Sequence, residues 1–117
     1  MIARLWHGVT PVSRADEYVQ YLAETGVRGV HATPGNQGVL VLRRTDETHA
    51  DFLFTSFWES FDAIRRFAGD DIERARYYPR DQEFLVTLEP GVTHYEVVRP
   101  TTPDLAAAYA HILRPLG

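Results

Sequence analysis

Apolar and polar positions alternate, or apolar positions run together, in four stretches of the chain. Each stretch is rich in β-branched and aromatic residues and is bounded by turn-forming residues, which predicts a β-strand. The four stretches cover residues 2–10, 39–44, 50–58 and 92–98. The polar run between the second and third stretches predicts a hairpin loop.

Helical spacing of apolar residues predicts two main helices. The first is expected over residues 14–25, with Ser13 as its N-cap and Gly26 as the residue that ends it. The second is expected to begin after Ser60, which has the side chain of an N-cap, and to end at Gly69. Phe61 and Ile64 are expected on its buried face.

Shorter elements are expected in the remaining parts of the chain. Residues 27–38 are dense in turn formers and predict an irregular connection. Asp70 with Glu73 resembles a capping box, which predicts a short helix that ends near residue 78 because Pro79 follows. A further helical turn is expected from Pro79 to residue 84.

The order strand, helix, strand, strand, helix, strand is the ferredoxin-like βαββαβ plan, an α+β fold with a four-stranded antiparallel sheet. The third strand is apolar on both faces, with Phe52, Phe54 and Trp58 on one and Leu53, Thr55 and Phe57 on the other. A sheet of this kind is not expected to leave a face in water. We therefore predict a homodimer that packs sheet against sheet, a dimeric α+β barrel.

The chain of 117 residues is long enough for one domain and too short for two. We assign residues 1–99 to the ferredoxin-like domain and residues 100–117 to a C-terminal helical tail. In the tail, Thr102 and Pro103 have the order of an N-cap and a first helical residue.

Charge and composition exclude several classes of function. The net charge is −4 and all twelve basic residues are arginines without a basic run, which argues against nucleic acid as a partner. The absence of cysteine excludes disulfides, a thiolate nucleophile and cysteine-ligated metals. No apolar run approaches the roughly 20 residues that span a bilayer, and no signal peptide is recognised, so a cytoplasmic protein is expected.

Nine of the fourteen aromatic residues lie between residues 52 and 84. Large rings at this density line pockets, and their Trp N–H and Tyr O–H groups can orient a ligand. The same rings serve equally well as ordinary core.

Three residues are candidates for catalysis: His94 and Trp58 on predicted strands, and Asn36 in the connection before the second strand. His94 lies within the last strand and has an intrinsic pKa of about 6.5, suited to a general base. The alternative is a half-buried histidine that bonds a backbone carbonyl. Trp58 lies where a strand gives way to a helix, so its N–H can hold a substrate oxygen. The alternative is an anchoring core residue.

Three further residues are candidate ligand contacts, and Asn36 has an alternative role as a turn residue. Arg4 and Trp6 share one face of the first strand and suit an aromatic anion, although a salt bridge would also explain Arg4. Asn36 is either a turn residue or a hydrogen-bond donor to a ligand. Tyr77 is either a pocket wall or part of a packed Tyr-Tyr-Pro corner.

No cofactor or metal is expected. The five histidines show no ligand spacing typical of metal sites, and no glycine-rich loop has nucleotide-binding spacing.

Several short motifs together resemble the antibiotic biosynthesis monooxygenase family of the dimeric α+β barrel superfamily. They are RLWHG at 4–8, PGN at 34–36, SFWES at 56–60, FAGDD at 67–71, YYP at 77–79 and HYEV at 94–97. The resemblance covers residues 1–99 and implies the fold already reached from the pattern. It also implies a small-molecule chemistry. Family enzymes oxidise polycyclic phenols to quinones with oxygen and no cofactor, relatives degrade haem, and other proteins with this barrel isomerise or cyclise small metabolites.

Haem-degrading members carry an asparagine on the first strand, whereas this strand carries none, which argues against haem chemistry. We therefore predict a cofactor-independent monooxygenase of an aromatic or polyketide-type molecule. His94 would be the base, Trp58, Asn36 and Arg4 would hold the developing anion, and Trp6 and Tyr77 would form walls. The alternatives are a non-oxidative isomerase or cyclase of a similar metabolite, and a non-catalytic ligand-binding dimer.

Overall fold

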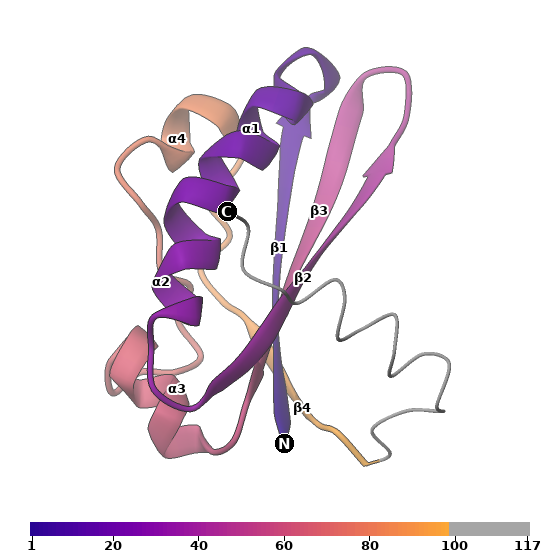
Figure 1. Cartoon of the computed structure of the whole chain (residues 1–117). Coiled ribbons are helices and arrows are strands. Elements are labelled where there is room, and N and C mark those ends of the chain that lie inside the picture. Colours follow the sequence, from indigo (N-terminus) through magenta and orange to yellow (C-terminus); the bar gives the residue numbers. More distant parts are fainter. Residues whose placement is uncertain (99–117) are drawn as a thin grey trace.

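A computed structural model describes residues 1–98, and the expected tail at residues 100–117 lies outside them. Four strands form one antiparallel sheet in the order β2-β3-β1-β4 (Figure 1). Their bounds are β1 Ile2–Pro11, β2 Asn36–Thr45, β3 His49–Trp58 and β4 Thr93–Glu96. The helical elements are a 3₁₀ turn Val12–Arg14, α1 Ala15–Leu22, a π-turn Ala23–Val27, α2 Arg28–His31, α3 Phe61–Ala68 and α4 Asp81–Phe84. The predicted ferredoxin-like α+β fold is confirmed.

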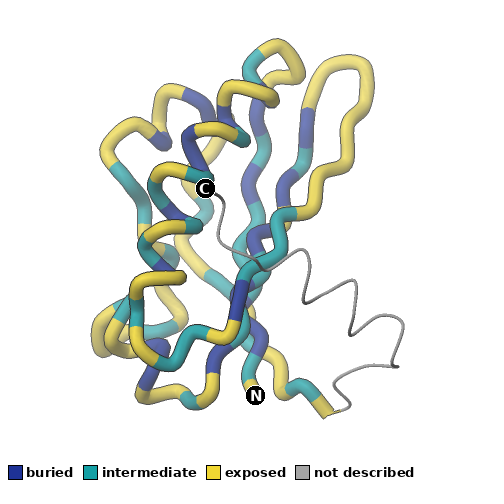
Figure 2. The backbone as a smooth tube through the Cα atoms, viewed as in Figure 1, coloured by how far each residue is buried: buried dark blue, intermediate teal, exposed yellow. Residues whose placement is uncertain are grey.

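All the helices lie on one face of the sheet (Figure 1). On that face β3 presents Phe52, Phe54, Ser56 and Trp58, each at most 8% exposed. Buried residues accordingly gather where the sheet meets the helices, while the tip of the β2–β3 hairpin is exposed (Figure 2). The opposite face leaves apolar side chains partly open, among them Leu42, Leu53 and Tyr95.

The first helical region is longer than the sequence predicts. It continues from α1 through the π-turn into α2 and ends at His31, so the prediction that Gly26 ends the helix is wrong. Gly26 is instead buried inside it, and a Cβ there would lie 3.1 Å from the ring of Phe54 on β3. The glycine therefore permits close approach of helix and sheet. Ser13 is not the N-cap either, because it lies within the 3₁₀ turn.

The second helix agrees with its predicted signals. The Ser60 hydroxyl accepts a hydrogen bond from the Ala63 N–H at 3.1 Å, and Gly69 ends α3 with φ of +83°. Ile64 is fully buried, but Phe61 is 45% exposed and so does not belong to the buried face.

The short helix predicted from Asp70 does not form. Its backbone groups bond elsewhere: the Arg4 side chain binds the carbonyls of Ile72 and Arg74, and the Ala75 N–H donates to the Pro90 carbonyl at 2.8 Å. These long-range partners satisfy the backbone in an irregular conformation that local capping signals do not anticipate. The turn expected after Pro79 is present as α4.

Candidate functional site

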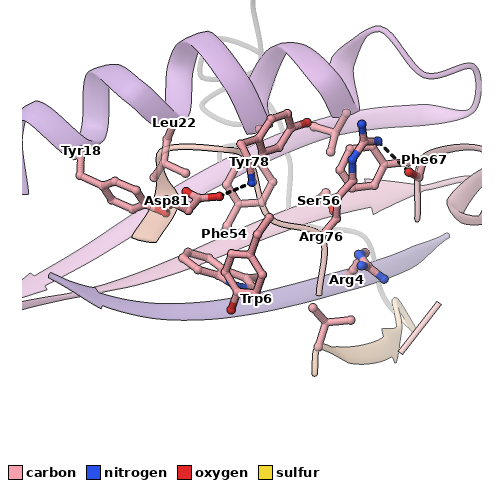
Figure 3. A pocket seen from close by; sticks show the side chains of 14 residues that line it. Arg4, Trp6, Tyr18, Leu22, Phe54, Ser56, Phe67, Arg76, Tyr78 and Asp81 are labelled. Carbon is pink, nitrogen blue, oxygen red and sulfur yellow. Dashed lines mark hydrogen bonds between the residues drawn. The ribbon is translucent and has the colours of Figure 1, made fainter. Parts of the chain in front are cut away.

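A cavity lies between the sheet and the helices (Figure 3). Its aromatic walls are Trp6, Tyr18, Phe54, Phe67, Tyr77 and Tyr78, and its polar lining groups are Arg4, Ser56, Arg76 and Asp81. The cavity volume is about 50 Å³. Since one water needs roughly 10–15 Å³, the cavity has room for a few waters. A ligand with several rings therefore requires movement of the wall.

Arg4 is a buried cation at one end of the cavity. Its side chain projects from β1 toward the helices, and the residue is only 4% exposed. The guanidinium donates to the carbonyl of Ile72 and, at 3.1 Å, to that of Arg74. No carboxylate within residues 1–98 forms an ion pair with it. Burial lowers the pKa of Arg4 to about 10, which still leaves it charged at neutral pH.

His94 lies beside Arg4 without lining the cavity itself. The two residues are partners in the β1–β4 register, and the Arg4 Nη1 atom lies 3.2 Å from His94 Nε2. A guanidinium only donates hydrogen bonds, so this nitrogen of the imidazole must accept and His94 must be uncharged. Burial, followed by the nearby Arg4 charge, lowers the pKa of His94, in agreement with that assignment.

Trp6 and Tyr77 form one wall of the cavity and are joined by a hydrogen bond. The Trp6 Nε1–H donates to the Tyr77 hydroxyl at 3.2 Å, and that hydroxyl donates to the Glu89 carbonyl at 2.5 Å. The two rings meet edge to face with centroids 6.2 Å apart. The Trp6 N–H and the Tyr77 O–H therefore both donate to protein acceptors, so the surface that this wall presents to the cavity is apolar.

Trp58 and Asn36 lie away from the cavity lining. Trp58 is fully buried, its Nε1–H donates to Ser56 Oγ at 2.8 Å, and its ring packs near Phe67. Asn36 opens β2 at a bulge, where its side chain donates to the Phe57 carbonyl at 3.1 Å and accepts from the Gly38 N–H at 3.0 Å. The structure thus gathers Arg4, Trp6 and Tyr77 around the cavity and places the other two residues in backbone and core contacts.

Asp81 is a lining residue that sequence reasoning missed. It is 4% exposed, accepts from the Tyr18 hydroxyl at 3.1 Å and from the Tyr78 N–H at 2.6 Å, and burial raises the pKa of its carboxyl. In the sequence, an aspartate two residues after Pro79 resembles an ordinary residue at the start of a helix. That local signal does not reveal that the carboxylate faces a cavity.

A second cluster of titratable groups lies around His7, on the open face of the sheet. His7 Nδ1 lies 2.6 Å from a Glu89 carboxylate oxygen, and His7 Nε2 lies 2.9 Å from an Asp51 oxygen. Only the protonated imidazole donates from both nitrogens. The hydrogen bond to Asp51 is accordingly the main cause that raises the pKa of His7, and Glu89 adds to it.

This cluster predicts a dependence of stability on pH. Because the pKa of His7 is higher in the folded state than its usual value of about 6.5, its stabilisation is complete below that value. The stabilisation is then lost as pH rises through the folded-state pKa. The three side chains are about two-fifths exposed, so we expect a loss of roughly 0.2–1 kcal/mol. Urea denaturation between pH 6.5 and 9 measures this loss as a decrease in the free energy of unfolding with pH. The same decrease in the His7→Asn variant would contradict the assignment to His7.

The hydroxyl of Tyr78 predicts a coupled pair of substitutions. It is buried without a hydrogen-bond partner among the described residues, and it lies where a Cβ on Gly29 would fall. We expect Tyr78→Phe to raise the free energy of unfolding by about 1 kcal/mol, since an unsatisfied buried group is removed.

Gly29→Ala supplies the matched test. We expect it to destabilise the native protein by steric conflict with the Tyr78 hydroxyl. In the Tyr78→Phe background, Gly29→Ala should leave the free energy of unfolding unchanged or raise it by up to about 1 kcal/mol, because alanine has the higher helix propensity. Thermal or urea denaturation of the four proteins gives the coupling, and additive effects would contradict this contact.

Within residues 1–98, no helix is long and apolar enough to cross a membrane. The same part of the chain contains no group of three or more His, Cys, Asp or Glu side chains that could hold a metal ion.

No protein-family model matches the chain, and no curated protein sequence matches it. Among solved structures, it is similar to a crystal structure of a mutant of MhuD that has two manganese protoporphyrin IX molecules bound per active site. The identity is 19%, the match covers 87% of this chain and 99% of that one, and the TM-score is 0.58. At this identity the likeness establishes a shared fold.

Proposed function

We propose that this chain, which shares its fold with a porphyrin-binding protein, binds a small aromatic molecule with an acidic oxygen and promotes its oxidation by oxygen without a cofactor. The ligand occupies the cavity between sheet and helices. Its oxygen pairs with Arg4, and its ring lies against Trp6 and Tyr77. The acidic oxygen of the substrate is a phenol or an enol, and a carboxylate can bind at the same position without reacting.

The observation that carries the proposal is the charge of Arg4. A cation that is 4% exposed and bonds only neutral groups among the described residues carries an uncompensated desolvation cost. An anionic oxygen at the cavity end would offset that cost and would form a charge-assisted hydrogen bond. The aromatic walls supply apolar contact for the rest of the ligand.

The chemistry follows from the contact between Arg4 and His94. A phenol or enol that reaches Arg4 can replace it as the donor to His94 Nε2, and the uncharged imidazole then takes the proton. Arg4 stabilises the resulting anion. The electron-rich anion passes electrons to molecular oxygen. One oxygen atom becomes the new carbonyl of the product, and the other leaves as water with the two hydrogens lost from the substrate.

Calorimetric titration with 2-naphthoate tests the binding step. We expect Arg4→Met to weaken the affinity about 10- to 100-fold, the value of a charge-assisted hydrogen bond. Arg43→Met removes the same charge from an exposed pair with Asp16, so it should change the affinity less than about threefold. Uncharged 2-naphthamide should bind the native protein as weakly as the acid binds Arg4→Met. Equal effects of the two arginines would contradict a specific anion site.

Oxygen uptake with an anthrone-type phenol tests the reaction. We expect quinone formation above the spontaneous rate, with a loss of about 10²–10⁴-fold in His94→Ala if His94 is the base. Turnover without oxygen consumption would favour the non-oxidative isomerase or cyclase. Binding without any turnover, unaffected by His94→Ala, would favour a ligand-binding protein.

We also propose that the chain forms a homodimer through the open face of the sheet. Leu42, Leu53 and Tyr95 are 50%, 37% and 58% exposed there, and a second sheet would cover them. Sedimentation equilibrium should give twice the mass of one chain. Leu53→Lys should yield monomer, whereas Leu88→Lys, at an exposed leucine outside the strands, should not. Dimers in both variants would contradict this interface.

A further inference from the structure

We infer that Asp81 is the second polar anchor of the cavity, and that the ligand carries a hydrogen-bond donor at the end opposite its acidic oxygen. This inference rests on the proposed function, because it assumes that the acidic oxygen binds at Arg4. It narrows the ligand from any aromatic acid to an elongated one that bears a hydroxyl or an amine at its far end.

The first support is the state of the Asp81 carboxylate. It is 4% exposed and lines the cavity, yet no basic side chain within residues 1–98 forms an ion pair with it. One oxygen accepts from the Tyr18 hydroxyl and the other from the Tyr78 N–H. A carboxylate offers about four lone-pair sites. Two acceptor sites therefore remain for a donor that enters the cavity.

The second support is the separation, along strand β3, of the levels at which Arg4 and Asp81 lie. Arg4 lies opposite Ser56 in the β1–β3 register, whereas the Tyr18 ring that bonds Asp81 packs against Phe52 with centroids 5.3 Å apart. Four residues along β3 separate these levels, which corresponds to roughly 13 Å. In Figure 3 Asp81 and Tyr18 accordingly lie at one end and Arg4 at the other.

The third support is what lies between the ends. Trp6, Phe54 and Tyr78 occupy the middle of the lining (Figure 3), so the central part of the cavity is aromatic. The Trp6 N–H and the Tyr77 O–H both have protein acceptors, so they do not compete for polar groups of a ligand. A flat apolar ring system with one polar group at each end matches this distribution of charge, once the wall has moved to admit it.

A pair of isomers tests the inference without any substitution. We compare 6-hydroxy-2-naphthoate, which has its hydroxyl at the far end of the ring system, with 3-hydroxy-2-naphthoate, which has it beside the acid. Calorimetry should show that the first binds about tenfold tighter than 2-naphthoate, as expected for a hydrogen bond to a charged acceptor. The second should gain less than about threefold.

Two variants locate the effect. Asp81→Asn should remove the advantage of 6-hydroxy-2-naphthoate over 2-naphthoate when both are titrated into the same variant. Tyr18→Phe keeps the carboxylate but removes the phenol that bonds it, so the advantage should remain. Far-UV circular dichroism and thermal unfolding of each variant establish that it is folded. The isomer comparison decides the question in the native protein if Asp81→Asn does not fold.

The outcomes separate this inference from the proposed function. Binding of 2-naphthoate that depends on Arg4, without any gain from the distant hydroxyl, would overturn the role of Asp81 and leave the proposed function in place. An equal gain for both isomers would also overturn it. Absence of any binding that depends on Arg4 would overturn the proposed function and this inference with it.

Discussion

Replacement of Trp58 by alanine is expected to lower the free energy of unfolding by about 3–5 kcal/mol, the usual cost of removing a large buried aromatic side chain. Trp58 is fully buried beneath α3, where its ring lies 5.9 Å from that of Phe67. The substitution leaves a cavity that the surrounding strand cannot fill. It also leaves the Ser56 hydroxyl without the donor that it now accepts from. Urea denaturation followed by circular dichroism measures the change.

Trp6→Ala is the matched control, because it removes the other tryptophan of the chain. Trp6 is partly exposed and borders a cavity, so its loss should cost less stability and should instead weaken binding of 2-naphthoate. Trp58→Phe should lie between the native protein and Trp58→Ala, since it keeps an aromatic ring but loses the N–H. A small stability loss in Trp58→Ala, together with loss of ligand affinity, would place Trp58 in the binding site instead of the core.

Gly35→Ala is expected to lower the free energy of unfolding by about 2–4 kcal/mol, the largest loss among Gly→Ala substitutions outside the cavity. Gly35 has φ of +93°, a left-handed conformation that costs a residue with a Cβ about 1–2 kcal/mol. An added Cβ would also lie 2.5 Å from the Cβ of Ala63, which is fully buried on α3. The helix would have to move away from the loop, although the Gly35 carbonyl holds the Glu59 N–H at 2.9 Å.

Gly91→Ala supplies the comparison for this effect. A Cβ at Gly91 would meet only the Glu73 carbonyl, at an ordinary 3.5 Å, and Gly91 does not have positive φ. We expect its stability to stay within about 1 kcal/mol of the native value, or to rise because the unfolded chain loses freedom. Similar losses in both variants, measured by thermal unfolding, would contradict the steric and conformational account of Gly35.

The strands and α3 were predictable because their signals are local. Alternation with period two assigns Phe52, Phe54 and Trp58 to one face of β3, and that face is the buried one. Ser60 and Gly69 mark the ends of α3 by the hydrogen bond and the backbone conformation that each residue type favours. These properties depend on neighbours within a few residues, so a single sequence contains them.

The helix ends around Gly26 and the segment after Asp70 were not predictable in the same way. A glycine that ends a helix and a glycine that lets a helix approach a sheet are identical in the sequence, and only the position of Phe54 distinguishes them. The segment after Asp70 carries helix-start signals, yet its carbonyls bind the side chain of Arg4, some seventy residues earlier. Long-range hydrogen bonds here override local propensity.

The aromatic-rich stretch, residues 52–84, was likewise predictable only in part. The sequence by itself determined that many aromatic residues are concentrated in and after one strand whose side chains alternate between its two faces. It also identified Arg4, Trp6 and Tyr77 as candidate ligand contacts. Only the tertiary structure decided that Trp58 is enclosed with its N–H bonded to Ser56, and that Tyr77 borders a cavity. It alone brought the carboxylate of Asp81 and the guanidinium of Arg4 to opposite ends of that cavity. The reason is physical: a residue type fixes what a side chain can bond, but burial and the choice of partner depend on segments that are distant in the chain.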